Sequence, residues 1–331
     1  MIIDEYKTDM TPYCIAEAGI NHNGDLETAL KMIEVAKHAG ANAVKFQTYK
    51  TEEFCNKDSE LYSIFKQCEF TVSEWKKIKE KCDKEKITFI STPQNHSDLE
   101  LLLELGIPAI KVGSDDFTNL PLLKRYSKTG MPLIMSCGMS DMAEVHNALD
   151  TVGYYEGYQV VLMLCTSQYP TPPEDVNLLK LLTLRYTFSN LCLGFSDHTQ
   201  GTLAAPLAIS YGAVAFETHF TLDKNMIGPD HYFSKNPKEL SEWITNIHLA
   251  NTMRGSDVVK PTLSEMEMRK IARRSVTAIT DIQEGEILTE NNIGLHRPGT
   301  GLPPSMMASI IGLHATKNIS KDTLLAWGDF R

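Results

Sequence analysis

Short apolar runs of strand length alternate with amphipathic, helix-like segments through the first 253 residues of the chain. Eight such runs occur, and each is followed by a segment with apolar residues at helical spacing. The runs span residues 13–19, 43–47, 87–93, 109–114, 132–136, 160–165, 191–195 and 213–216. Eight β/α units in about 250 residues match the size of a (β/α)8 TIM barrel. An open, doubly wound sheet is the alternative fold, but no Gly-x-Gly-x-x-Gly motif follows the first strand.

The pattern changes at Arg254, which suggests a second domain. Residues 254–270 break the regular alternation and then become polar and charged, so we interpret them as a linker. Residues 271–331 contain short β-rich segments with a faint repeat, in which Asp281-Ile-Gln-Glu-Gly-Glu-Ile-Leu resembles Asn318-Ile-Ser-Lys-Asp-Thr-Leu-Leu. We therefore expect a barrel domain over residues 1–253 and a small compact domain over residues 271–331.

The formal net charge of −10 limits the partners of the protein. An acidic chain matches neither nucleic acid nor an anionic membrane surface, and we expect no such partner. The sequence has no apolar run near the roughly 20 residues of a spanning helix and no signal-peptide pattern at its start. We expect a soluble, cytoplasmic protein in which an anionic substrate would be bound by local lysine or arginine residues.

Cysteine chemistry is not favoured by the sequence. The seven cysteines include no Cys-x-x-Cys pair, and four of them lie in apolar runs, where cysteine behaves as a small buried residue. Cys137 and Cys165 lie near strand ends, so a thiol nucleophile is disfavoured without being excluded.

Two lysines, Lys45 and Lys111, lie inside apolar strand runs. Burying an ammonium group costs free energy unless an anion lies beside it. The sequence allows two kinds of anionic partner for these lysines. One is a salt bridge with Glu17 inside the barrel. The other is a phosphate or carboxylate ligand, bound at the carboxyl ends of the strands together with nearby hydroxyl groups. A Schiff-base aldolase is a further alternative, because desolvation would lower the pKa of either lysine.

Two histidines follow neighbouring strands. His198 comes after the run at 191–195, and His219 comes after the run at 213–216. In a parallel sheet both imidazoles would emerge at the same edge, where α/β active sites lie. Either residue could be structural, but the pair also suits a metal ion that polarises an oxygen of an anionic substrate.

Several motifs occur together in the chain and give it a family resemblance. They are Ala16-Glu-Ala-Gly-Ile-Asn-His-Asn-Gly24, Val44-Lys-Phe-Gln47, Phe89-Ile-Ser-Thr-Pro93, Lys111-Val-Gly-Ser114, Tyr169-Pro170, Gly194-Phe-Ser-Asp-His-Thr199, His219-Phe-Thr-Leu-Asp223, Gly228-Pro-Asp-His231 and Arg297-Pro-Gly. In this respect the chain resembles the sialic acid (N-acetylneuraminate) synthase family. The resemblance implies condensation of phosphoenolpyruvate with an N-acetylmannosamine-type sugar, catalysed by a TIM barrel followed by an antifreeze-like (SAF) domain.

The resemblance also implies roles for individual residues. His198 and His219 would hold a divalent metal ion, Mn²⁺ or Mg²⁺, while Glu17 and Asp116 would transfer protons. The phosphoenolpyruvate site would be formed by Lys45, Thr92, Lys111, Ser114, Ser136, Ser167 and Ser196. The sugar site would be formed by Glu17, Tyr169, Asp230 and Arg297. The family forms a domain-swapped homodimer, in which the small domain of one subunit places this arginine over the barrel of the other.

The chain departs from the family pattern at several positions, which leave the acceptor sugar open. Asp115-Asp116 replaces the Gly-Glu and Ser167 replaces the Asn found in many bacterial members. Ile227 stands where an Asp is common, and Ile271 stands where an aromatic residue closes the sugar site. The acceptor could thus be N-acetylmannosamine, its 6-phosphate, or a diamino-deoxy sugar leading to legionaminic- or pseudaminic-type acids. A Schiff-base aldolase and a non-catalytic carbohydrate-binding protein are the competing functions.

Overall fold

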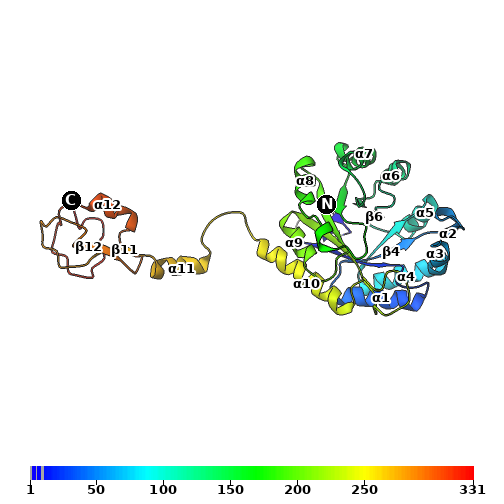
Figure 1. Ribbon diagram of the computed structural model, residues 1–331, viewed down its shortest axis with the longest axis horizontal. Helices are drawn as coiled ribbons and strands as arrows, with labels where there is room; N and C mark the ends of the chain where they lie inside the picture. Colours follow the sequence, from blue (N-terminus) through cyan, green and yellow to red (C-terminus); the bar gives the residue numbers. More distant parts are fainter. Residues whose placement is uncertain (1, 5, 9–10) are drawn as a thin grey trace. The chain divides into compact units, whose positions relative to one another are not determined.

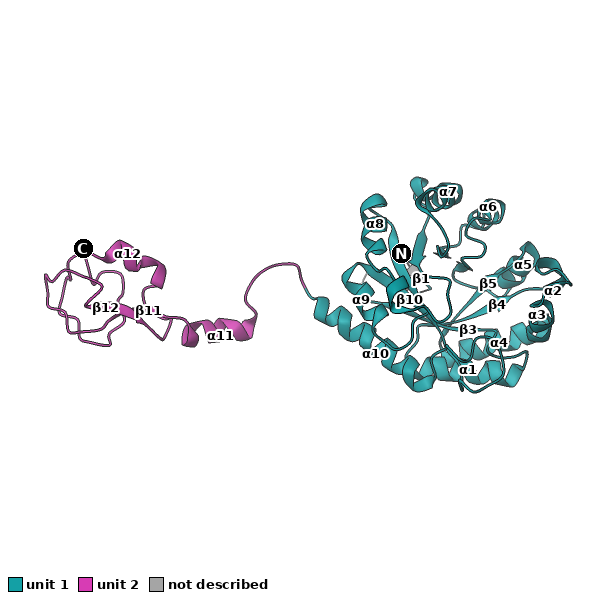
Figure 2. Ribbon diagram, in the orientation of Figure 1, with its two compact units in different colours: residues 1–255 teal, residues 256–331 magenta. Residues whose placement is uncertain are grey.

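The computed structural model describes residues 2–4, 6–8 and 11–331. Within the described chain, two compact units are formed by residues 1–255 and residues 256–331 (Figure 2). No helix in the part of the chain that the structure describes is both long and apolar enough to cross a membrane.

The first unit is built on eight parallel strands. They are β3 (Tyr13–Gly19), β4 (Ala43–Thr48), β5 (Thr88–Pro93), β6 (Ile110–Val112), β7 (Leu133–Ser136), β8 (Val160–Leu164), β9 (Cys192–Asp197) and β10 (Ala213–His219). Their order in the sheet is β5-β4-β3-β10-β9-β8-β7-β6, and the two end strands β5 and β6 lie beside each other. The sheet is therefore a nearly closed barrel, which confirms the predicted (β/α)8 fold.

Helices surround the barrel, as Figure 1 shows. They are α1 (Leu26–His38), α4 (Val72–Glu85), α5 (His96–Glu104), α6 (Leu120–Ser127), α7 (Met142–Val152), α8 (Lys180–Thr187), α9 (Ala204–Ser210) and α10 (Pro237–Arg254). Polar caps fix where several of them begin: the Asp25 side chain accepts a hydrogen bond from Thr28 N at 2.8 Å, and Thr71, Asp141 and Asn236 form capping boxes. Two short helices, α2 (Thr51–Phe54) and α3 (Tyr62–Cys68), lie between β4 and α4, and 3-10 turns occur at Tyr154–Glu156 and Pro173–Asp175.

The inside of the barrel is apolar at its amino-terminal end. Inward side chains from six of the strands, together with Ala109 directly before β6, form one buried cluster, which also contains Ile3. Ile3 belongs to a hairpin of β1 (Ile2–Ile3) and β2 (Tyr6–Lys7) that the sequence analysis did not predict, because two-residue strands carry no alternation. The hairpin contributes to filling this end of the barrel.

The alternation of side chains along a strand places polar groups directly above this apolar layer. Residues two positions apart point to the same side of a sheet. In seven of the strand runs, the last inward apolar residue is therefore followed, two positions later, by an inward polar one. The pairs are Ile15 and Glu17, Ala43 and Lys45, Ile90 and Thr92, Ala109 and Lys111, Ile134 and Ser136, Met163 and Cys165, and Ala215 and Glu217. This periodicity builds a polar layer at the carboxyl ends of the strands.

The second unit has its own buried core. It contains α11 (Leu263–Ala272), β11 (Ser275–Ala278), β12 (Ile293–His296), a 3-10 turn at Pro304–Met306 and α12 (Met307–Ile310). The repeat noted in the sequence has a structural counterpart: Ile282 and Ile319 exchange two backbone hydrogen bonds of 2.8 Å each. The first side chain of each repeat segment also accepts a hydrogen bond from the backbone of the other segment. Asp281 accepts from Lys321 N and Asn318 accepts from Glu284 N, both at 2.8 Å.

Candidate active site

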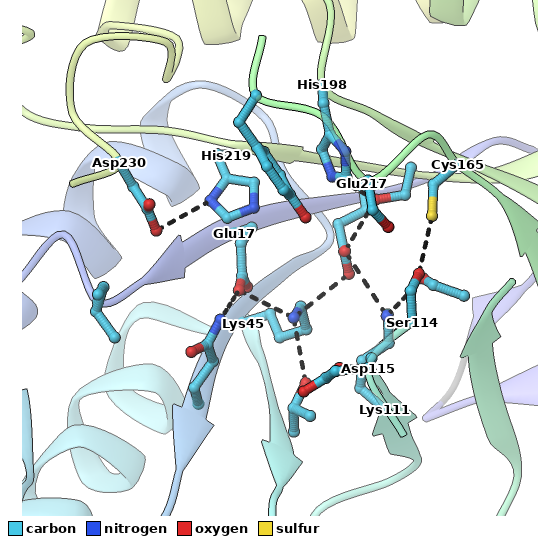
Figure 3. A pocket seen from close by; sticks show the side chains of 18 of the residues that line it. Glu17, Lys45, Lys111, Ser114, Asp115, Cys165, His198, Glu217, His219 and Asp230 are labelled. Atoms are coloured by element: carbon cyan, nitrogen blue, oxygen red, sulfur yellow. Dashed lines mark hydrogen bonds and ion pairs between the residues drawn. The ribbon is translucent and has the colours of Figure 1, made fainter. Parts of the chain in front are cut away.

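A cavity of about 400 Å³ opens at the carboxyl ends of the barrel strands (Figure 3). Twelve of the residues predicted from the sequence line it. They are Glu17, Lys45, Thr92, Lys111, Ser114, Ser136, Ser167, Tyr169, Ser196, His198, His219 and Asp230. The fold therefore brings together in one place groups that come from all eight strands or from the loops that follow them.

The floor of the cavity is a network of two lysines and two glutamates (Figure 3). Lys45 Nζ lies 3.0 Å from Glu17 Oε1 and 3.8 Å from Glu217 Oε2, and Lys111 Nζ lies 3.8 Å from Glu217 Oε1. All four side chains are at least 95% buried. Of the two partners considered for the lysines, the salt bridge with Glu17 is present for Lys45. Both lysines also line the cavity, so an anionic ligand as the second partner stays a prediction.

Hydroxyl groups complete the environment of the two ammonium groups. Lys45 donates to Thr92 Oγ1 at 3.2 Å, and Lys111 donates to Ser136 Oγ at 2.8 Å and to the Val112 carbonyl at 3.0 Å. Each lysine is held by groups of its own or a neighbouring strand, and its position is therefore set by the barrel rather than by a loop. Such fixed cations and hydroxyls suit the oxygens of a small phosphate or carboxylate.

The protonation of this network is uneven. Burial raises the pKa of Glu17 to about 7, although the Lys45 ammonium opposes this effect. Burial also acts to raise the pKa of Glu217, but Lys111 and Lys45 outweigh it and hold that pKa below its ordinary value. Glu17 is therefore the member of the network that titrates near neutral pH. The Oε2 atoms of both glutamates are buried without a hydrogen-bond partner in the described structure, so each can accept a further donor or proton.

The two histidines lie side by side above this floor, with ring centroids 5.5 Å apart. His198 Nδ1 lies 2.8 Å from the Thr166 carbonyl, an interaction that requires a proton on Nδ1. Nε2 is then unprotonated and lies 3.2 Å from Ser196 Oγ. Burial lowers the pKa of both histidines, which keeps the imidazoles neutral. Tyr169 packs on both rings, at centroid distances of 4.3 Å and 5.7 Å.

The donor set of this pair fits a metal ion with open coordination positions. His219 Nδ1 is buried without a hydrogen-bond partner, and the Asp230 carboxylate is 3.9 Å away. Neutral imidazoles with free nitrogens are suitable ligands for divalent metals. Among the described residues, no group of three or more His, Cys, Asp or Glu side chains is arranged for a metal ion.

A loop tied to the first strand carries Asp230 to the rim of the cavity. Asn23 donates to the Ile227 carbonyl at 2.9 Å, and the fully buried His231 lies 2.7 Å from Thr221 Oγ1. Burial raises the pKa of Asp230 to about 6. These contacts, together with that of His231 Nε2 with Asn23 Oδ1 at 3.3 Å, explain how two motifs distant in the sequence, at residues 21–24 and 228–231, pack against each other.

The outer wall of the cavity is apolar, and the sequence analysis did not predict it. It is formed by Ile20, Phe54, Leu61, Ile64, Phe65 and Met139. Three of these residues come from α2 and α3, and Leu61 directly precedes α3. Their segment could be described from the sequence only as an aromatic insertion, because nothing in its composition shows which face of the barrel it covers.

Some predicted residues are placed differently. Asp116 is not among the residues lining the cavity, and its carboxylate accepts a hydrogen bond from Asn119 at 2.9 Å; the neighbouring Asp115 lines the cavity instead. Arg297 belongs to the second unit, so its role at the cavity stays a prediction. Glu217, which stands at the centre of the network, is not among the site residues predicted from the sequence. Its position two residues before His219 on β10 was the available signal.

Taken together, the barrel and its cavity define a TIM-barrel protein in which two lysines and two histidines line one cavity at the carboxyl ends of the strands. The sequence profile of the NeuB family matches residues 32–259, and that of the SAF domain matches residues 273–331. These matches cover most of the chain.

Individual relatives are similar over nearly their whole length. An N,N'-diacetyllegionaminic acid synthase of Legionella pneumophila is 38% identical over 338 residues, which is 97% of this chain and 95% of that protein. A human N-acetylneuraminate-9-phosphate synthase is 32% identical over 333 residues, covering 94% of this chain and 90% of that protein. A crystal structure of an N-acetylneuraminic acid (sialic acid) synthetase from Leptospira borgpetersenii, in complex with citrate, superposes with a TM-score of 0.74 at 34% identity. That match covers 78% of this chain and 90% of the other.

The chain belongs to the NeuB family. It is a synthase-type enzyme with a SAF domain at its carboxyl-terminal end, and the resemblance seen in the sequence is confirmed.

Proposed function

We propose that the protein condenses phosphoenolpyruvate with an open-chain 2-acetamido aldose, forming a nonulosonic acid and releasing phosphate. The observation that carries the proposal is the cavity itself, in which Lys45 and Lys111 lie beside His198 and His219. The first pair matches a small phosphorylated acid, and the second pair matches a metal-assisted reaction of a carbonyl group.

The phosphoenolpyruvate half of the site would use the ammonium groups and the hydroxyl groups around them. We assign Lys45, Thr92, Lys111, Ser114, Ser136, Ser167 and Ser196 to this half, all of which line the cavity. The two glutamates neutralise the lysines in the absence of ligand, which prevents two uncompensated charges from being buried. Binding of the phosphorylated acid would recruit the ammonium groups through their remaining N–H donors.

His198 and His219 would hold the divalent ion, Mn²⁺ or Mg²⁺, which supplies Lewis-acid polarisation of the aldehyde oxygen when it is bound. The protein's own contribution is to keep both imidazoles neutral by burial and to fix the His198 tautomer through the Thr166 carbonyl. Tyr169 restrains both rings by packing against them.

Glu17 is the group best suited to move a proton in this reaction. As C3 of phosphoenolpyruvate attacks the aldehyde carbon, a new carbon–carbon bond forms and negative charge develops on the aldehyde oxygen. Glu17, whose pKa is raised to about 7 by burial, can carry the proton that converts this oxygen into a hydroxyl group. The attack leaves C2 as an oxocarbenium ion, to which water adds with loss of one proton, which restores protonated Glu17. The C2 hydroxyl group then loses its proton to the departing phosphate as the keto group forms and the bond between C2 and the bridging oxygen breaks.

The walls of the cavity favour an uncharged acceptor. Among the described lining residues, Lys45 and Lys111 are the only lysines or arginines, and both belong to the phosphoenolpyruvate half. The cavity is also lined by the apolar wall and by Asp115 and Asp230, whose carboxylates would repel a sugar phosphate. Methyl and acetamido groups suit such a wall, so we favour a diacetamido-deoxy hexose of the legionaminic type over N-acetylmannosamine and over its 6-phosphate.

Acceptor profiling tests the proposal. Phosphate release would be measured with phosphoenolpyruvate, Mn²⁺ and a panel of N-acetylmannosamine, its 6-phosphate and 2,4-diacetamido-2,4,6-trideoxyhexoses. We expect release with at least one acceptor, no release without a sugar, and the highest kcat/KM with a diacetamido sugar. Absence of release with every member of the panel would refute the enzyme assignment. Borohydride trapping of a pyruvate adduct, insensitive to chelators, would instead support a Schiff-base aldolase.

The His219→Ala variant tests the metal proposal separately. We expect it to lose phosphate release and Mn²⁺ binding, measured by the electron paramagnetic resonance of the free ion, while its thermal unfolding stays close to that of the wild type. Wild-type turnover in this variant would refute the proposal that His219 holds a metal ion needed for the reaction.

A further inference from the structure

Three polar side chains converge on one glycine at the edge of the cavity. A Cβ atom placed on Gly138 would lie 2.8 Å from both Ser114 Oγ and Cys165 Sγ, and closer still to Ser167 Oγ. All three side chains line the cavity, and they come from the loops after β6 and β8. This close approach requires the residue at position 138 to lack a side chain.

The hydrogen bonds around Ser114 restrict the direction of its hydroxyl proton. The Gly138 N–H donates to Ser114 Oγ at 3.0 Å. Cys165 Sγ lies 3.1 Å from the same oxygen, and either atom can be the donor in that contact. A serine hydroxyl has one proton and two lone pairs. If the thiol donates, both lone pairs are occupied, and the proton must point to a third partner.

We propose that Cys165 is a positioning residue, whose thiol donates to Ser114 Oγ and thereby directs the Ser114 proton to an oxygen of the bound phosphorylated acid. This inference rests on the proposed function, because it assumes that Ser114 contacts phosphoenolpyruvate. The inference assigns a role to Cys165, which lines the cavity and is not required as a nucleophile.

The surroundings of Cys165 favour the donor role. Burial raises the pKa of this thiol, so it retains its proton at neutral pH and can act as a donor. The adjacent Ser167 Oγ is buried and has no hydrogen-bond partner in the described part of the chain, so a second hydroxyl is available at the same place. The two serines would then present their protons together to the ligand.

Cys137 provides a matched control within the same chain. It is as buried as Cys165, with 7% of its surface exposed in each case, and burial raises its pKa to about 12. Its Sγ, however, donates to the Met163 carbonyl at 3.4 Å, and Cys137 is not among the residues that line the cavity. Loss of this thiol should therefore leave substrate binding unchanged.

The test compares Cys165→Ala, Cys165→Ser and Cys137→Ala in the full-length protein. Binding of phosphoenolpyruvate alone would be measured by calorimetry, and KM values for both substrates would be taken from phosphate release. We expect Cys165→Ala to raise the Kd and KM for phosphoenolpyruvate about fivefold, the effect of one neutral hydrogen bond. The KM for the sugar should stay within about twofold. The serine variant, which keeps a donor, and Cys137→Ala should both remain close to the wild type.

A double-mutant cycle with Ser114→Ala distinguishes positioning from a merely structural role. If the thiol acts through Ser114, Cys165→Ala adds no further loss of phosphoenolpyruvate affinity in the Ser114→Ala background. Two results would overturn this inference alone, provided that the wild type binds phosphoenolpyruvate. One is additive losses of phosphoenolpyruvate affinity in the double variant, and the other is unchanged affinity in Cys165→Ala. A wild-type protein that binds no phosphoenolpyruvate would overturn the proposed function as well.

Discussion

Replacing Lys111 by methionine removes one buried cation while keeping a long, unbranched side chain. In the wild type, Lys111 Nζ lies 3.8 Å from Glu217 Oε1 and donates to Ser136 and to the Val112 carbonyl. The variant leaves the buried Glu217 carboxylate with Lys45 as its remaining cation, also at 3.8 Å. Removing one partner of a buried ion pair costs about 3–5 kcal/mol, because the other charge stays buried.

We expect the free energy of unfolding to fall by about 3–4 kcal/mol, the lower part of that range. Lys45 still compensates part of the Glu217 charge, and Ser196 still donates to its Oε1 at 3.2 Å. For a domain of this size such a loss lowers Tm by roughly 10 °C. Urea unfolding and thermal unfolding of the full-length protein, followed by circular dichroism at neutral pH, would measure both quantities.

Two further variants make this prediction specific. Lys111→Met combined with Glu217→Gln removes the uncompensated charge and should recover at least half of the lost stability. Lys124→Met, at an exposed position of α6, should change stability by less than about 0.5 kcal/mol. The reasoning would be refuted if Lys111→Met were as stable as the wild type, or if the double variant were less stable than Lys111→Met.

Three other predictions concern catalysis. Glu17→Gln should slow phosphate release by about 10²–10⁴-fold. Because protonated Glu17 is the proposed acid, the wild-type rate should also decrease as pH rises through about 7, and this inflection should disappear in the variant. Phe65→Ser, in the apolar wall, should raise the KM for a diacetamido sugar and leave that for phosphoenolpyruvate unchanged; equal effects on both would contradict the assignment of the wall. Mixing inactive Arg297→Ala and His219→Ala proteins should restore partial activity if the arginine acts in trans, whereas no recovery after subunit exchange would exclude a shared site.

The barrel could be predicted because the alternation of apolar and polar residues that its strands require is visible in the sequence. The apolar run before each strand end and the polar residue that follows it, as in Ala43 and Lys45 or Ala109 and Lys111, reflect the twofold alternation of a strand. Burying a lysine among apolar residues demands an anion, which is why the sequence alone indicates a binding site at these two positions.

Other parts of the site could not be predicted, for physical reasons. The importance of Glu217 depends on contacts with lysines of two other strands, and sequence spacing does not contain such distances. The choice between Asp115 and Asp116 depends on how one loop turns after β6. The apolar wall depends on the docking of α2 and α3, whose short helices bury little surface of their own.

The most direct test of the central claim is a crystal structure of the full-length protein soaked with Mn²⁺ and phosphoenolpyruvate. The account predicts the phosphorylated acid in contact with Lys45 and Lys111, and the metal ion bound by His198 and His219 in the same cavity. Phosphoenolpyruvate bound elsewhere, or a metal ion that does not contact these histidines, would contradict it.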